Sequence, residues 1–146
     1  MSNLPIINKG HVNIDKRGKL FYNNTFNSSD IKRIYIIENK NNLIKRGWVG
    51  HKIEKRWFSA INGAFKVLLI KIDNWKKPDI NLIPQEFILK SNSLDFLFIP
   101  EGYVTNIKSL EKSSKLLVLA DYLFEEIKDD YRFDQNYFSN NYKFNE

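Results

Sequence analysis

The sequence predicts an all-β fold of the sandwich or barrel type, and three observations support this prediction. Short runs rich in β-branched and aromatic residues recur along the chain, with turn-forming residues between them about every 8–12 residues. Asn62-Gly63 separates two of these runs and is the strongest short hairpin signal, because both residues tolerate a positive φ. Only the acidic stretch Asp121–Asp130 has a pattern compatible with a helix, and only a brief one.

The expected elements follow in chain order. Ile31–Ile37 alternates and is β-branched and aromatic, so it predicts a half-buried strand. The further expected strands are Trp57–Ile61, Ala64–Ile72, Phe87–Lys90, Asp95–Ile99 and Leu116–Ala120. Turns are expected at Asp73–Asp79 and at Pro100-Glu101-Gly102, where proline, glycine and asparagine interrupt the strand pattern.

The chain is expected to form one domain over residues 1–146, because its length suits a single core and it shows neither repeats nor a linker. The barrel is expected over about 10–122, followed by a short helical or irregular C-terminal tail, 123–146. Tyr131–Glu146 is rich in asparagine and aromatic residues, and we expect it to pack on a neighbouring subunit.

Composition excludes several classes of protein. Apolar residues make up 42% of the 146 residues, enough for a buried core, so a disordered chain is excluded. The absence of cysteine excludes disulfides, thiolate metal sites and a cysteine nucleophile, and two histidines argue against a multi-histidine metal site. The apolar runs are too short to span a bilayer and Met1–Pro5 lacks the pattern of a signal peptide, so we expect a cytoplasmic protein with no membrane partner.

The positive charge lies in the first half of the chain. Residues 1–60 carry twelve Lys and Arg against four Asp and Glu, whereas 61–146 carry eleven against thirteen. The basic residues are interspersed with apparent strands, unlike the clustered, apolar-poor tail typical of nucleic-acid binding. An anionic small ligand is therefore the favoured partner, and nucleic acid is ranked last.

One motif points to a family. Arg46-Gly47-Trp48-Val49-Gly50-His51 is followed by Arg56 and, later, by Ile99–Thr105 with its Pro100-Glu101-Gly102 turn. This spacing resembles the two motifs of the cupins, whose metal-binding members place histidines and a carboxylate at the positions of Val49, Arg56 and Thr105. Only His51 remains, and one imidazole beside an arginine cannot hold a divalent metal. The resemblance therefore implies a cupin-type double-stranded β-helix, a jelly-roll barrel, with neither metal nor cofactor.

Within the cupins the chain resembles the dTDP-sugar 3,4-ketoisomerases (WxcM-like proteins) and, less closely, the dTDP-4-dehydrorhamnose 3,5-epimerases. The resemblance covers about residues 10–138, and its motifs are specific by their order and spacing. The stretches that carry it are Asp15–Leu20, Ile31–Tyr35, Arg46–Lys52 with the run to Gly63, and Leu117–Tyr122 with Asp130–Asp134.

The resemblance implies a nucleotide-linked 4-keto-6-deoxyhexose as substrate. The C4 ketone acidifies the hydrogen on C3, so a base can form an enediolate. Reprotonation at C3 from the other face gives epimerisation, and reprotonation at C4 gives ketoisomerisation. Both routes need a base, an acid and a cationic donor near the sugar ring.

The chain departs from the family at two positions. The first histidine of the ketoisomerase His-Ala-His motif, which is the base of the epimerases, is Val49 here, and the epimerase tyrosine falls at Leu117. These replacements disfavour a 3,5-epimerase. A ketoisomerase that uses His51, a C3 epimerase and a sugar-binding cupin without turnover all remain open.

The candidate catalytic residues are His51, Tyr35 and Arg56. His51 shares a strand face with Val49 if that strand is regular, and is the candidate base; the alternative is a structural histidine. Tyr35 is the candidate acid. Arg56 is assigned either to the enediolate oxygen or to a surface ion pair with Glu54, which would contribute little stability.

The candidate binding residues are Arg17, Arg33, Arg46, Lys52 and Tyr103. Guanidinium groups bind phosphate oxygens in bidentate geometry, so Arg17 and Arg46 are matched with the nucleotide diphosphate, with surface or fold-stabilising salt bridges as the alternative. Arg33 is expected on the same strand face as Tyr35. Tyr103 is assigned to a base or sugar, or to the core. The resemblance also implies a homodimer with N-terminal strands exchanged or paired, and the carboxylates of Asp121–Asp134 are expected to be mostly solvated.

Overall fold

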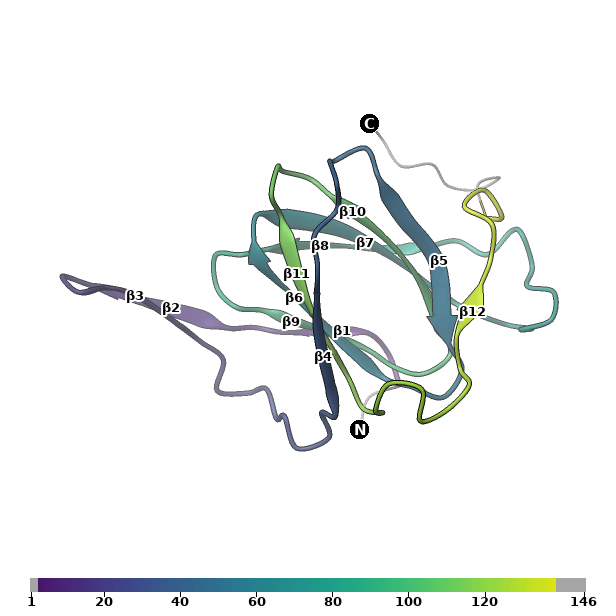
Figure 1. Ribbon diagram of the computed structural model, residues 1–146, viewed down its shortest axis with the longest axis horizontal. Helices are drawn as coiled ribbons and strands as arrows, with labels where there is room; N and C mark the ends of the chain where they lie inside the picture. The colour runs from purple at the N-terminus through teal and green to yellow at the C-terminus, as the bar shows by residue number, and fades with distance from the viewer. Residues whose placement is uncertain (1–2, 139–146) are drawn as a thin grey trace.

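The computed structural model describes residues 3–138 and confirms the all-β jelly-roll class (Figure 1). Two five-stranded antiparallel sheets face each other. The first sheet has the order β1 (Ile6–Asn8), β9 (Phe96–Ile99), β6 (Arg56–Asn62), β11 (Lys115–Ala120) and β4 (Arg33–Ile37). The second has the order β12 (Tyr131–Arg132), β5 (Lys45–His51), β10 (Tyr103–Ser109), β7 (Ala64–Lys71) and β8 (Gln85–Lys90).

The main core lies between the two sheets. Phe58 and Val118 of the first sheet pack with Phe65 and Ile107 of the second, and all four are buried. The predicted turn at Asn62-Gly63 is present, because β6 ends at Asn62, β7 begins at Ala64 and Gly63 has a φ of +71°. The predicted hairpin is wrong, because β6 pairs with β9 and β11 whereas β7 pairs with β8 and β10 in the other sheet. Glycine adopts that conformation at little cost, and a Cβ at position 63 would lie 2.1 Å from Ser114 Oγ. The strongest local signal in the sequence thus fixes the connection between the sheets.

A separate two-stranded hairpin leaves the body of the molecule. Strands β2 (His11–Asp15) and β3 (Gly18–Tyr22) pair only with each other and project to the left in Figure 1. Ile14 and Leu20 on this hairpin are 65% and 62% exposed. The alternation pattern does not indicate these strands, nor β1, β10 and β12, because they are short, polar or rich in charge.

The expectation of a helix at Asp121–Asp130 is wrong, because residues 3–138 contain no helix and this stretch forms turns. Its acidic side chains bind backbone N–H groups instead: Glu126 accepts from Leu123 at 2.9 Å, and Asp121 and Asp129 accept from the loop before β6. Such local acceptors compete with a helical backbone. No helix within residues 3–138 is long and apolar enough to cross a bilayer.

The expected packing of the C-terminal tail is also corrected for its first part. Residues 131–138 lie on their own chain, with Phe138 buried against Trp48 at a ring separation of 5.2 Å and the Tyr137 hydroxyl donating to the Pro78 carbonyl at 2.6 Å. The apolar outer face of β5, β7 and β10 needs a cover, and this segment supplies it. The rest of the tail, 139–146, lies outside the described residues.

Candidate active site

A cavity of about 430 Å³ lies between the two sheets. Strands β4, β5, β6 and β10 contribute its walls, and the loop between β5 and β6 adds Glu54. The residues predicted to be catalytic, His51, Tyr35 and Arg56, all line this cavity. They come from three different strands, so the fold alone brings them together.

Strand β5 presents alternate side chains to the cavity, as predicted. Val49 and His51 line the cavity. Trp48, which precedes Val49 on β5, packs on the opposite face of the sheet and is 3% exposed. The valine therefore lies on the same wall as the histidine. The position where the family resemblance places a first histidine carries an aliphatic side chain inside the cavity.

A β-bulge also directs Arg46 into the cavity. On β10, Thr105 pairs with Val49 and Ile107 pairs with Arg46, so two residues of β5 oppose Asn106 alone. The extra residue shifts the alternation of the strand. Gly47 belongs to this bulge, and a Cβ there would lie 2.2 Å from the Asn106 side chain, so only glycine fits.

The His51 ring is held in one orientation. Its Nδ1 lies 2.8 Å from the backbone carbonyl oxygen of Asp129, which can only accept a hydrogen bond. The neutral ring therefore carries its proton on Nδ1 and leaves Nε2 as a free base. Burial above all, and then the positive charge of Arg56, lower the pKa of His51 below its ordinary value. The ring is consequently neutral and basic near pH 7.

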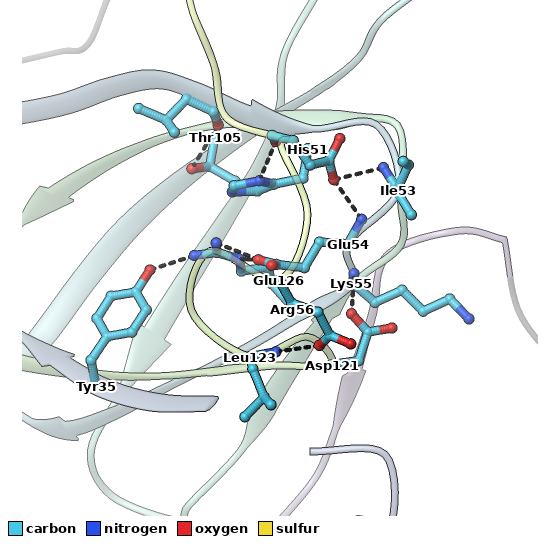
Figure 2. Close-up of polar contacts among 12 residues, drawn as sticks. Tyr35, His51, Ile53, Glu54, Lys55, Arg56, Thr105, Asp121, Leu123 and Glu126 are labelled. Carbon is cyan, nitrogen blue, oxygen red and sulfur yellow. Dashed lines mark hydrogen bonds and ion pairs between the residues drawn. The ribbon is translucent and has the colours of Figure 1, made fainter. Parts of the chain in front are cut away.

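Arg56 links two other groups of the cavity (Figure 2). Its Nε donates to Glu54 Oε1 at 2.6 Å, and its NH1 donates to the Tyr35 hydroxyl oxygen. The Arg56 and Glu54 side chains are only 11% and 7% exposed, so their ion pair is not the solvated surface pair considered from the sequence. Because Tyr35 accepts from Arg56, its own hydroxyl proton is free to be donated to a ligand.

Two arginines lie where the cavity opens to solvent, and we call Arg46 and Arg132 the rim arginines. Both line the cavity and both are exposed. Arg46 Nε donates to Asn39 Oδ1 at 2.6 Å, and buried Asn39 donates to Ser109 at 3.3 Å, so a buried amide orients this guanidinium. Arg132 comes from β12 and donates to the exposed Asp130 at 3.1 Å.

This combination of a jelly roll and a cavity with one imidazole and several arginines agrees with the comparison with known families. A sequence model of the family described as FdtA, WxcM-like, C-terminal matches residues 2–143. The chain belongs to this family. No protein with a curated description matches it in sequence.

Solved structures share the fold of this WxcM-like chain. A mutant of the 3,4-ketoisomerase QdtA from Thermoanaerobacterium thermosaccharolyticum, in complex with TDP-4-keto-6-deoxyglucose, superposes with a TM-score of 0.70 at 24% identity, covering 96% of this chain and 95% of that one. A 3,4-ketoisomerase from Helicobacter canadensis gives 0.69 at 22% identity, covering 92% and 95%. A dTDP-4-dehydrorhamnose 3,5-epimerase from Bacillus anthracis gives 0.69 at 13% identity, covering 86% and 76%.

Three predicted binding residues of the WxcM-like chain lie outside its own cavity lining. Arg17 is on the projecting hairpin and pairs with Asp15 at 2.7 Å. Arg33 shares the face of Tyr35, as predicted, but its guanidinium lies between the rings of Tyr35 and Phe124, 4.7 and 4.8 Å from their centroids. Lys52 is exposed in the loop after β5.

Tyr103 is the fifth predicted binding residue and it does line the cavity. It is 6% exposed and packs with the main core, so it serves both as core and as wall, and burial raises the pKa of its hydroxyl. Residues 3–138 contain no group of three histidine, cysteine, aspartate or glutamate side chains placed to hold a metal.

Sequence reasoning missed two contributions from the C-terminal segment of the WxcM-like chain. Asp129 is 5% exposed and binds the loop that follows His51, an exception to the expectation, otherwise confirmed, that the carboxylates of this stretch are mostly solvated. Arg132 enters the cavity lining from β12. Arg132 lies within Asp130–Asp134 and Asp129 directly precedes it. This stretch is one of those that carry the family resemblance, and nothing else in the sequence points to either residue.

Proposed function

We propose that this WxcM-like protein is a metal-independent isomerase of a nucleotide-linked 4-keto-6-deoxyhexose, of the dTDP-sugar 3,4-ketoisomerase type. The observation that carries the proposal is that one cavity contains both a His51 ring with a free Nε2 and a Tyr35 hydroxyl that accepts a hydrogen bond from Arg56. A base and a proton donor are the two groups that an enediolate mechanism requires. A similar structure was solved with TDP-4-keto-6-deoxyglucose, which supports this choice of substrate class.

In the proposed reaction His51 Nε2 removes the proton from C3 while Tyr35 donates its hydroxyl proton to the C4 oxygen. The resulting enediol then returns its O3 proton to Tyr35, and His51 delivers its proton to C4, which leaves the ketone at C3. Atoms and charges balance without a redox step. Arg56 steadies the negative charge on oxygen, because a fixed cation in a partly buried site stabilises a developing oxyanion.

We assign the nucleotide diphosphate to the rim arginines, Arg46 and Arg132. Both guanidinium groups line the cavity at exposed positions, where they can meet a large charged group that stays partly solvated. Tyr103 contributes an aromatic wall for the sugar or base. A binding role for Lys52 and Arg33 stays a prediction, because neither side chain lines the cavity of a single chain.

Two alternatives from the sequence bear on Val49. Loss of the first histidine suits a sugar-binding cupin without turnover, and a C3 epimerase would need a second proton donor on the opposite face of the sugar from His51. The ketoisomerase is preferred because a single base can remove a proton and return it to the adjacent carbon on the same face of the sugar.

The test is transfer of solvent deuterium into a dTDP-4-keto-6-deoxyhexose, followed by NMR. We expect the wild-type protein to label the sugar and to form a 3-keto product, and His51→Asn to reduce the rate by about 10²–10⁴-fold. His11→Asn is the matched control, because His11 is exposed on the hairpin outside the cavity lining. A C3-epimeric product would select the epimerase, and binding of TDP without exchange in several keto sugars would select the binding protein.

We also propose a cytoplasmic homodimer that supplies deoxysugars for surface polysaccharide. The projecting hairpin exposes Ile14 and Leu20, and β4 at the sheet edge exposes Ile34 and Ile36 at 67% and 53%. Exposed apolar side chains on edge strands favour association with a second copy. In such a dimer, Arg17 of one chain could reach the cavity of the other. A molecular mass of one chain, measured by light scattering, would refute the dimer.

A further inference from the structure

We propose that Asp129 is a positioning residue that holds both halves of the active site: the His51 base and the Glu54–Arg56–Tyr35 network. The effect of Asp129 on catalysis rests on the proposed function, whereas its effect on the tautomer of His51 does not. Asp129 lies in the turn segment before β12, 78 residues after His51 in the chain, and touches the loop between β5 and β6.

Both oxygens of the Asp129 carboxylate accept hydrogen bonds from backbone donors. Its Oδ1 accepts from Lys52 N at 2.8 Å, and its Oδ2 accepts from Ile53 N at 2.8 Å and from Glu54 N at 2.7 Å. The side chain is buried, with the residue 5% exposed. Only a carboxylate offers acceptors on both terminal atoms, because the NH₂ group of an asparagine can only donate. The three bonds therefore select a carboxylate over an amide at this position.

The backbone of the same residue fixes the base. The Asp129 carbonyl oxygen lies 2.8 Å from His51 Nδ1, and the carboxylate binds the residue next to His51. With its Nδ1 bonded to this carbonyl and the following backbone held by the carboxylate, the ring keeps its proton on Nδ1 and its Nε2 unprotonated. If the carboxylate released the loop, the ring could rotate or exchange tautomers, and Nε2 would no longer be a constant base.

The same anchor reaches the acid side of the site through Glu54. Its N–H is bound to Asp129, and its side chain receives Arg56 Nε at 2.6 Å (Figure 2). Arg56 in turn donates to Tyr35. One carboxylate thus sets the distance between the base on β5 and the proton donor on β4, although it lies outside the cavity lining.

The experiment measures the His51 tautomer directly, by NMR of the full protein labelled with ¹⁵N-histidine. The chain has two histidines, so exposed His11 is an internal reference and the assignment is simple. We expect His51 of the wild type to show the Nδ1–H tautomer, and Asp129→Asn to show a mixture that includes Nε2–H. With a keto sugar, we expect kcat of this variant to fall about 10–100-fold while the affinity for TDP stays close to wild type.

Asp95→Asn is the matched control. Asp95 is also a poorly exposed carboxylate that accepts a backbone N–H, from Gly10 at 2.8 Å, but it lies outside the cavity lining. We expect it to leave the His51 tautomer and kcat unchanged. Asp129→Glu, which keeps the charge but moves the carboxylate, takes the same measurement if the asparagine variant does not fold.

Two results would overturn the proposal. One is a wild-type His51 in the Nε2–H tautomer, which decides the matter even if neither variant folds. The other is an Asp129 variant that folds and keeps both the wild-type tautomer and the wild-type kcat. The tautomer measurement uses no substrate, so a protein that turns over no keto sugar would refute the proposed function and leave this result standing.

Discussion

The cavity has two arginine environments that differ in how the protein holds the charge. Arg56 is 11% exposed and bonded to Glu54 and Tyr35, so its position is fixed before any ligand arrives. The rim arginines are exposed, and Arg132 is 73% exposed with one exposed aspartate as partner. Fixed, buried charge suits an oxyanion that forms at one point, whereas solvent-exposed charge suits a diphosphate that stays partly solvated.

The difference assigns the two environments to different kinetic constants. A preorganised donor stabilises the transition state without reorganisation, so its loss should appear in kcat. A donor that contacts a remote phosphate equally in the ground and transition states should appear in KM. Substitution of each kind of arginine should therefore separate an effect on kcat from an effect on KM.

Replacement of Arg56 by methionine should abolish most turnover and also destabilise the fold. Loss of the cation removes the oxyanion donor, for an expected decrease in kcat of about 10²–10³-fold. It also leaves the Glu54 carboxylate buried without its partner, which costs about 3–5 kcal/mol in free energy of unfolding. Urea denaturation and steady-state kinetics check the two effects separately.

The double variant Glu54→Gln/Arg56→Met is the control for this prediction. Removing both charges should recover most of the stability, because the cost comes from the unpaired carboxylate. It should not recover kcat. A double variant as active as wild type would show that Arg56 is structural only.

Replacement of either rim arginine by methionine should weaken binding rather than chemistry. A hydrogen bond between charged groups is worth about 1.5–3 kcal/mol, and solvent exposure reduces this, so we expect KM to rise about tenfold with kcat nearly unchanged. The effect of Arg132→Met should shrink as salt is added, because exposed charges are screened. A decrease in kcat equal to that in kcat/KM would place this arginine at the reacting atoms instead.

The sequence predicts the fold class and the centre of the site better than its edges. The turn at Asn62-Gly63 and the shared face of Val49 and His51 follow from local rules, turn chemistry and the period of a strand, and both are confirmed. The hairpin expected at that turn is wrong, because the strands on either side of it pair in different sheets. These rules need no knowledge of distant contacts.

What the sequence could not show depends on long-range geometry. The bulge opposite Asn106 that directs Arg46 inward is a property of two paired strands, not of either alone. Asp129 is buried against three backbone donors that lie 75 or more residues away in the chain. The local sequence around Asp129 therefore indicates only an acidic turn. The ion pair of Glu54 and Arg56 was visible from its spacing, but not its burial.

The smallest predicted effect concerns His51 and the stability of the fold at low pH. Burial and Arg56 lower the pKa of His51 in the folded state below the ordinary value of 6.5 that applies in the unfolded chain. Between these two values the unfolded state binds more protons, so stability is full above about pH 6.5, falls as the pH falls below it, and levels off below the folded pKa. The His51→Asn variant should lack this part of the decline, and the wild-type kcat/KM should persist below pH 6.5 because the base is still unprotonated there. Denaturation of both proteins across this range measures the difference, and identical curves would mean that His51 titrates as an exposed histidine does.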